Sequence, residues 1–264
     1  MSTLNSAEYT AYLERIHFPI AEGSPKPSLH LLQRLHEAHL LTVPFENLSI
    51  HYGEPIVLQA DKLFHKIVSQ RRGGFCYELN GLFARLLQHF GFEVTLLSAG
   101  VANDAGIFGP EFDHLTLLIH QLEGADWLAD VGFGASFRLP LRFEADMEQV
   151  DVDGKKYRLQ RENENQRTSW ILQQLHENTW QSQYRFTLQS HELDDFTEMC
   201  HYQQTSPESH FTQKRICSLA TPTGRITLSD LLLITTKEGQ RSERMLASEE
   251  EYREVLKQRF EVVL

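Results

Sequence analysis

The hydrophobic period of this chain changes at Gly91, and this change constrains the fold more than any other feature of the sequence. Before Gly91, apolar residues recur at steps of three and four, which is typical of amphipathic helices. After it, apolar and polar residues alternate in short runs, which is typical of strands. The chain has 264 residues, enough for one large domain or a few small ones packed together. We therefore expect an α+β protein in which a helical bundle over residues 1–91 precedes β-structure.

The N-terminal part carries the helical period over residues 6–16, 28–41, 61–70 and 76–90. Pro44 ends the second helix, because proline lacks the backbone N–H that a helix needs. Asp61 is a candidate cap of the third helix. The fourth helix follows a Gly-Gly turn and stops at Gly91. Its apolar residues form one stripe that begins at Cys76, so we expect Cys76 to face the interior or a cleft.

The part after Gly91 carries strand-like runs over residues 93–101, 114–120, 126–132, 155–160, 168–174 and 181–188. Asp153–Gly154 is a strong hairpin signal between two of them. Short strands at this spacing predict an antiparallel sheet or barrel. In the last third we expect a strand at 215–220, a TPTG turn, one strand across 225–236 and a helix at 248–259.

The charge and the hydropathy of the chain limit its partners. A net charge of −11 argues against a non-specific nucleic-acid binder, because phosphate backbones need a basic face. It leaves room for a small basic pocket that holds a phosphorylated cofactor. The N-terminus has no basic region followed by an apolar run, and no apolar segment approaches the ~18–20 residues that span a bilayer. We therefore expect no signal peptide and no membrane partner.

The cysteines of the chain are Cys76, Cys200 and Cys217. Their odd number and irregular spacing argue against a disulfide framework. No CxxC pair occurs, so the common structural zinc patterns are missing. We therefore expect a cytoplasmic protein with free thiols and no metal.

Cys76 is a candidate nucleophile, because it follows Gly73–Gly74 at the first turn of a helix. Backbone N–H groups there lack helical partners and the helix dipole is positive, and both effects favour the thiolate. The thiolate is the nucleophilic form of cysteine. A plain buried cysteine explains the same position, since cysteine is among the most buried residue types. A base and an orienting acid are needed to decide between these interpretations.

His114 and Asp130 are the candidates for that base and that acid. His114 begins an alternating strand, and Asp130 lies in the next strand with a number of the same parity. If the loop has an odd number of residues, with Gly124 supplying an unusual backbone angle, a register that pairs 114 with 130 places their Cβ atoms ~5 Å apart. The carboxylate would then hold the imidazole tautomer and stabilise the imidazolium. Spacing alone does not choose His114 over His120, and a purely structural histidine stays an alternative.

Five segments of the chain resemble blocks of the arylamine N-acetyltransferase family. They are TVPFENLSI at 42–50, RRGGFCYELNG at 71–81, HLTLLI at 114–119, DVGFG at 130–134 and TSPESHF at 205–211. The blocks occur in the family order and extend over essentially the whole chain. Each block alone is a weak signal, whereas five in order are specific.

The resemblance implies a fold, an activity and a set of catalytic residues. The fold would be a helical domain (1–91) carrying the nucleophile, a β-barrel domain (92–190) carrying the histidine and the aspartate, and a C-terminal α/β lid (191–264), with a cysteine-protease-like catalytic core. The activity would be transfer of acetyl from acetyl-CoA to an arylamine or arylhydrazine, with O-acetylation of N-hydroxyarylamines as an extension. Cys76 would accept the acetyl group, His114 would act as the base, and Asp130 would orient the imidazole.

Further positions match family sites around the nucleophile. Phe45 and Phe133, and with them Val101, match positions that line the acceptor pocket, where aromatic walls suit a flat aryl ring. Phe45 and Phe133 can also be read as ordinary core residues. Glu46 and Arg72 resemble a structural ion pair that holds the nucleophile loop.

The resemblance makes Gly132, Gly134 and Tyr202 candidates for contacts with coenzyme A. The chain departs here from eukaryotic members of the family. It reads GPEFD before the histidine strand, has Glu208 where a small hydroxyl residue is found, and ends at Leu264 without a longer C-terminal tail. The compact form resembles bacterial members.

Other functions stay open at this point. The first alternative is a related acyltransferase or amide synthase that uses another acyl group. The second is a hydrolase or a transglutaminase-like thiol enzyme that needs no CoA, and the third is a non-catalytic relative that keeps the fold. The sequence leaves open whether the protein is a monomer or a homodimer.

Overall fold

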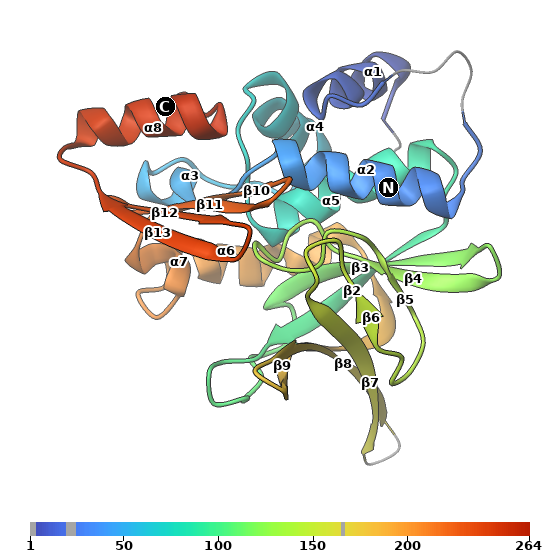
Figure 1. The fold of residues 1–264 in the computed structure, drawn as a ribbon. Helices are drawn as coiled ribbons and strands as arrows, with labels where there is room; N and C mark the ends of the chain where they lie inside the picture. Colours follow the sequence, from blue (N-terminus) through green and yellow to red (C-terminus); the bar gives the residue numbers. More distant parts are fainter. Residues whose placement is uncertain (1–3, 20–24, 165–166) are drawn as a thin grey trace.

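The structure is a computed structural model, and it describes residues 4–19, 25–164 and 167–264. The helical elements before Gly91 are α1 (Ser6–Arg15), α2 (Leu29–Thr42), α3 (Leu48–His51), α4 (Ala60–Phe64), the π-helical turn η1 (His65–Ser69) and α5 (Cys76–His89). In Figure 1 they gather at the top of the molecule, with α5 next to the strands below. The predicted helices 6–16, 28–41 and 76–90 are thereby confirmed.

The helix α5 lies at the centre of the molecule. Its N-terminus is fixed by Glu78, whose carboxylate accepts a hydrogen bond from the backbone N–H of Phe75 at 3.2 Å. Its C-terminus is followed by Gly91, which has a φ of +87°. The sequence predicts that one apolar stripe of this helix is buried. In the structure all residues from Cys76 to Leu87 are buried, so more of the helix surface is covered than predicted. The helix is therefore surrounded by protein on nearly all sides.

The regular helix predicted over residues 61–70 is wrong in two respects. The segment is α4 followed by the turn η1, and a π-helical turn of five residues has no distinct hydrophobic period in a sequence. Asp61 does not cap the helix, because α4 begins one residue earlier and Gln59 occupies the cap position. Asp61 lies in the first turn instead, where the helix dipole also favours an acidic residue.

In the part of the chain that the structure describes, eight strands form one antiparallel sheet in the order β5-β4-β3-β2-β9-β8-β7-β6. The strands are β2 (Val94–Val101), β3 (His114–Leu122), β4 (Ala125–Ala129), β5 (Leu141–Arg142), β6 (Gln149–Val150), β7 (Lys156–Glu164), β8 (Arg167–His176) and β9 (Thr179–His191). The side chain of Gln149 joins the two edge strands, since it exchanges two hydrogen bonds, of 2.7 and 3.0 Å, with the backbone of Arg142. The sheet is therefore a nearly closed barrel, as predicted.

The strand β3 is buried on both faces, because it separates two cores. Its odd-numbered residues, such as Leu115 and Leu117, pack with the helices. An even-numbered residue, Leu118, packs inside the barrel. The alternation predicted for this strand is confirmed, and it directs His114 away from the helical core face.

The predicted pairing of 114 with 130 is wrong by two residues. In the structure Leu117 pairs with Ala129 and Leu118 with Leu128, so Asp130 lies just beyond the end of β4. The turn has two residues, Glu123 and Gly124, both with positive φ, and not the odd number that was predicted. A bulge in β3 before this turn adds the odd residue. His114 and Asp130 therefore keep the same face as diagonal neighbours.

The C-terminal part holds a second sheet and further helices. The helical elements are the 3₁₀ turn η2 (Leu193–Phe196), α6 (Thr197–Thr205), α7 (His210–Gln213) and α8 (Glu249–Phe260). Within the described residues, five antiparallel strands make up this sheet, in the order β1 (Phe45–Glu46), β10 (Ile216–Thr221), β11 (Gly224–Ser229), β12 (Leu232–Lys237) and β13 (Gln240–Met245). One face of this sheet packs on α8, and Figure 1 shows both beside the helices of the first third.

The strand predicted across residues 225–236 is two strands in the structure. Ser229 pairs with Leu232, so a two-residue turn interrupts the run, and Asp230 there has a φ of +47°. The apolar composition of the run hid this turn. Because β1 belongs to this sheet, strand pairing crosses the predicted boundary at residue 91. The division into domains 1–91, 92–190 and 191–264 stays a prediction.

Among the helices that the structure describes, none is both long and apolar enough to span a membrane.

Candidate active site

Cys76 is the first residue of α5, and its side chain lines a pocket of about 250 Å³. Phe75 before it is extended, so the chain enters the helix at the cysteine itself. His114 lines the same pocket from the start of β3, because α5 packs directly against this strand. The fold therefore brings the nucleophile candidate and the base candidate to one cavity.

His114 is bound to Asp130 in a buried pair. The distance from His114 Nε2 to Asp130 Oδ2 is 2.7 Å, and both side chains are almost fully enclosed. Because the carboxylate is ionised, Nε2 carries the proton of this hydrogen bond and Nδ1 is left to accept a proton. His120, the other base candidate, bonds the Thr95 hydroxyl at 2.7 Å and is not among the described residues that line the pocket.

Asp130 is held in place by several donors besides His114. Asn80 Nδ2 and the Gly132 N–H both bind Oδ1 at 2.9 Å. The Tyr184 hydroxyl binds Oδ2 at 3.0 Å. Burial alone would raise the pKa of Asp130, but the charge of His114 and the hydrogen bonds outweigh it and lower this pKa below its usual value. Asp130 is therefore ionised at neutral pH.

The thiol of Cys76 lies in an environment that disfavours an isolated thiolate. Burial raises the pKa of Cys76 well above its usual value, and the backbone N–H of Leu115 offsets only part of this rise. A lone thiolate is therefore unfavourable in the pocket. Transfer of the thiol proton to His114 creates a thiolate–imidazolium pair without net charge, and the imidazolium faces Asp130. The positive N-terminus of α5 favours the same pair.

Gly132 packs against the backbone of Cys76. A Cβ at this position would lie 2.7 Å from Cys76 Cα and 2.7 Å from Asn80 Nδ2, so a larger residue does not fit. Gly134 follows with a φ of +85°, a conformation that favours glycine. The DVGFG segment is thus shaped to pass close to the start of α5.

The walls of the pocket are mostly apolar. Phe45, Val101 and Phe133 line it, together with Phe211 from the C-terminal part. The Phe133 ring meets the His114 ring edge to face, with centroids 5.1 Å apart. A flat, uncharged group therefore fits beside the thiol and the imidazole.

Comparison with known proteins identifies the family of this chain. The model of the N-acetyltransferase family matches residues 28–264. The arylamine N-acetyltransferase / N-hydroxyarylamine O-acetyltransferase of Salmonella typhimurium is 34% identical over 237 residues, which cover 89% of this chain and 81% of the relative. Arylamine N-acetyltransferase 2 of Mus musculus is 34% identical over 234 residues, covering 81% of this chain and 78% of the relative.

A solved structure of the S. typhimurium arylamine N-acetyltransferase matches this one with a TM-score of 0.90 and 31% identity, covering 97% of this chain and 92% of that chain. This chain belongs to the arylamine N-acetyltransferase family. The predicted family and the predicted fold class are thereby confirmed.

In this member of the arylamine N-acetyltransferase family, buried ion pairs support the loop before Cys76. Arg72 Nε lies 3.1 Å from Glu46 Oε1, so the predicted pair of Glu46 and Arg72 is present. Lys66 adds a second pair, 2.8 Å from Glu78. Burial alone would raise the pKa of Glu46, but the charges of Lys66 and Arg72 outweigh it and lower this pKa.

Several residues of the site were not found by sequence reasoning. Asn80 follows Cys76 by one helical turn and is a polar residue in an apolar helix, which is a signal that the sequence does contain. Asp113 and Gln203 line the pocket, and so does His210. Tyr184 belongs to the barrel interior, and nothing in the pattern of β9 distinguishes it from a core tyrosine.

Of the residues predicted to contact CoA in this acetyltransferase, Gly132 lines the pocket. Gly134 and Tyr202 are not among the described residues that line it. Tyr202 is exposed on α6, and its hydroxyl lies 3.4 Å from Glu208 Oε2. Within residues 4–19, 25–164 and 167–264, no group of three or more His, Cys, Asp or Glu side chains is placed to hold a metal ion.

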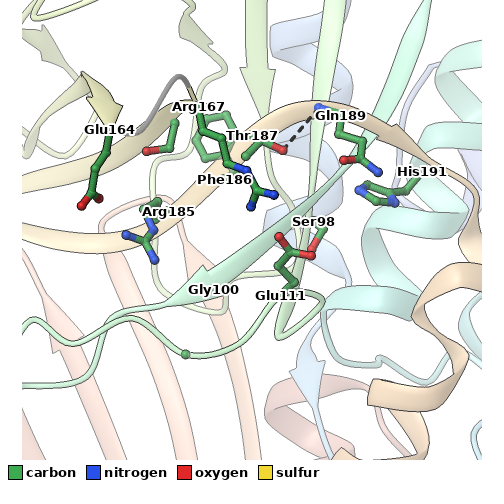
Figure 2. A pocket seen from close by; sticks show the side chains of 12 residues that line it. Ser98, Gly100, Glu111, Glu164, Arg167, Arg185, Phe186, Thr187, Gln189 and His191 are labelled. Atoms are coloured by element: carbon green, nitrogen blue, oxygen red, sulfur yellow. Dashed lines mark hydrogen bonds between the residues drawn. The ribbon is translucent and has the colours of Figure 1, made fainter.

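A separate pocket lies on the outer face of β2 and β9. Figure 2 shows it lined by Ser98, Glu111 and Arg185, among others. Arg185 alternates along β9 with Tyr184 and Phe186, which point into the barrel. The catalytic candidates do not line this pocket, so it is distinct from the cavity at Cys76.

Proposed function

We propose that this chain transfers the acetyl group of acetyl-CoA to arylamines and arylhydrazines through an acetyl-Cys76 intermediate. One observation carries the proposal: Cys76 and His114 line a single apolar pocket, and Asp130 fixes the imidazole from the buried side. The S. typhimurium relative is named for N-acetylation of arylamines and O-acetylation of N-hydroxyarylamines. We extend both acceptor classes to this chain.

The first half-reaction forms the acetyl-enzyme. His114 Nδ1 takes the thiol proton, and Cys76 Sγ attacks the carbonyl carbon of the thioester. The backbone N–H of Cys76 is suited to stabilise the oxyanion, because the first N–H groups of a helix have no partner within it. When the intermediate collapses, the bond between the carbonyl carbon and the CoA sulfur breaks. The imidazolium returns its proton to that sulfur, and free CoA leaves.

The second half-reaction transfers the acetyl group to the acceptor. Arylamines are weak bases and stay neutral near neutral pH, so their lone pair is available for attack on the acetyl carbon. His114 Nδ1 takes the proton that the amine nitrogen loses. The bond between the acetyl carbon and Cys76 Sγ breaks, and the proton passes to the sulfur. The products are an amide and the original thiol.

The pocket walls provide a place for the acceptor ring. Phe45, Val101 and Phe133 offer apolar surface beside the reacting groups. For CoA, we place the thioester next to Gly132, which lines the pocket and packs directly against Cys76. Gly134 and Tyr202 are proposed as contacts further from the thioester.

The test is acetyl transfer by the purified protein to a panel of arylamines and arylhydrazines. Acetyl-CoA is compared with propionyl-CoA and malonyl-CoA, because another acyl group is the main alternative. We expect transfer from acetyl-CoA, loss of transfer in Cys76→Ser, and retention in Cys200→Ala, which removes another buried cysteine. Full transfer by Cys76→Ser would refute the proposal, and a preference for malonyl-CoA would favour the alternative.

A further inference from the structure

The residue before His114 places a carboxylate in the otherwise apolar pocket. Asp113 lines the cavity together with Cys76 and His114. Its Oδ2 accepts the backbone N–H of Val101 at 3.2 Å, and its Oδ1 accepts Gln203 Nε2 at 2.8 Å. The position of this charge is therefore fixed by β2 on one side and by α6 on the other.

The side chain of Gln203 lies between Asp113 and Ser209. Its amide Nε2 donates to Asp113 Oδ1, and its Oε1 lies 2.5 Å from Ser209 Oγ. Burial raises the pKa of Asp113 above its usual value, and the Val101 N–H, the charges of His114 and His210 and the Gln203 amide offset only part of this rise. Both hydrogen-bond partners of Asp113 are donors, and they favour the ionised carboxylate.

The charge of the pocket changes during the reaction. In the acetyl-enzyme Cys76 is a neutral thioester, and His114 has given its proton to the departing CoA. Asp130 then faces a neutral imidazole, and the two donors that bind Asp113 favour a second negative charge in the pocket wall. Among the described residues that line the pocket, His210 is the remaining titratable side chain. The acceptor therefore enters a pocket in which negative charge predominates.

We propose that Asp113 selects the acceptor by charge, so that neutral and cationic arylamines or arylhydrazines are acetylated in preference to those that carry a carboxylate or a sulfonate. This inference rests on the proposed acetyl transfer and specifies its substrate class. Asp113 forms part of the wall of a pocket of about 250 Å³, so an anionic substituent held inside this pocket lies near its carboxylate. Like charges separated by several ångströms in a partly desolvated site change a rate by roughly tenfold or more.

A matched control lies two residues away. Glu111 is exposed and lines the outer pocket of the barrel, where Figure 2 shows it near Ser98, and it does not line the cavity at Cys76. Glu111→Gln removes the same unit of charge as Asp113→Asn without altering that cavity. It separates a local effect of Asp113 from the general effect of a negatively charged protein.

The experiment compares acceptors of one shape and different charge, namely 4-aminobenzoate, 4-aminobenzamide and 4-aminobenzylamine. The measured quantity is kcat/KM for each, with acetyl-CoA as donor and, separately, with an activated phenyl acetate that loads Cys76 without CoA. We expect wild type and Glu111→Gln to favour the amide over the carboxylate by roughly tenfold or more. Asp113→Asn and Asp113→Ser should reduce this ratio severalfold with either donor, and Asp113→Glu should preserve it.

The ratio of kcat/KM between the amide and the carboxylate is used because Asp113 also influences the electrostatics of His114. A change in His114 lowers the rate with every acceptor alike, so it cancels in this ratio. An unchanged ratio in both charge-removing variants would overturn the inference, and so would equal use of the three acceptors by wild type. If only the CoA-dependent reaction responds, Asp113 serves the donor and the inference is wrong. Failure of wild type to acetylate even the neutral amide would instead refute the proposed function.

Discussion

The variant Asp130→Asn tests the assigned roles of the buried pair most closely. An asparagine replaces one carboxylate oxygen by an NH₂ group, which must point either to the side of Oδ1 or to the side of Oδ2. The side of Oδ1 faces two donors that cannot reverse, the Gly132 N–H and the Asn80 amide. The Asn80 amide is fixed because its own oxygen accepts the Val131 N–H at 2.9 Å. The NH₂ group is therefore directed to His114.

This orientation reverses the tautomer of the histidine. His114 Nε2 must become the acceptor, so the proton moves to Nδ1, which can then no longer take the proton of Cys76. We expect the rate of Cys76 acetylation to fall by about 10³–10⁴-fold, the loss produced when a triad holds the wrong tautomer. The fold should lose only about 1–2 kcal/mol, because the Gly132 N–H and the Asn80 amide keep their acceptor and the Tyr184 hydroxyl can donate to Thr116 Oγ1 instead.

The assay is a rapid-mixing measurement of the acetylation burst, combined with urea unfolding of the same samples. Tyr184→Phe is the control, because it removes a hydrogen bond to the same oxygen without reversing the tautomer. We expect its acetylation rate to fall by at most about 10²-fold, because a hydrogen bond to a charged group contributes about 1.5–3 kcal/mol. A folded Asp130→Asn protein that acetylates within tenfold of wild type would show that tautomer control is not the role of Asp130.

Three further predictions concern the support of the site. Gly132→Ala should abolish acetylation and destabilise the fold by about 1–3 kcal/mol, because its Cβ would lie 2.7 Å from Cys76 Cα. If the variant kept its acetylation rate, the close packing of Gly132 on Cys76 would be contradicted. Arg72→Met should lower the free energy of unfolding in urea by about 3–5 kcal/mol, since it leaves Glu46 buried without its closest cation, whereas Glu54→Gln, at an exposed partner of the same arginine, should cost under about 1 kcal/mol. The pKa of Glu46 is lower in the folded state than in the unfolded state, so its stabilisation is complete above the unfolded pKa of about 4 and is lost as the pH falls through the folded pKa. Urea titrations between neutral and acidic pH should therefore show a falling stability whose slope is smaller in Glu46→Gln, and equal slopes would contradict the assignment.

The sequence predicts the central part of the site because that part depends on the hydrophobic period within one helix and one strand. The 3.6-residue period of α5 places Cys76 at its start, and the two-residue period of β3 gives His114 its face. The pairing of His114 with Asp130 was predicted for an incorrect register. The two side chains still share a face, because the bulge and the two-residue turn together insert an odd number of residues between the strands. The sequence does not show that a bulge is present.

The rest of the site depends on contacts between distant segments. Tyr184 and Gln203 reach the site only through the closure of the barrel and the docking of α6, and neither stands out in its own segment. Asp113 adjoins a predicted catalytic residue, yet its position in the pocket depends on how the preceding loop folds back on β2. The strand β1, two residues long, has no period of its own and forms because β10 and Gly74 lie beside it. Long-range packing therefore decides what the periods leave open.

The central claim is that Cys76 is the residue that carries the acetyl group. It is tested most directly by incubating the protein with acetyl-CoA in the absence of an acceptor and mapping the acetylated residue by peptide mass spectrometry. We predict one acetyl group per chain, on Cys76, and its removal when an arylamine is added. Acetylation of Cys200, Cys217 or a lysine with Cys76 unmodified, or an acetyl group that an arylamine does not remove, would contradict the account.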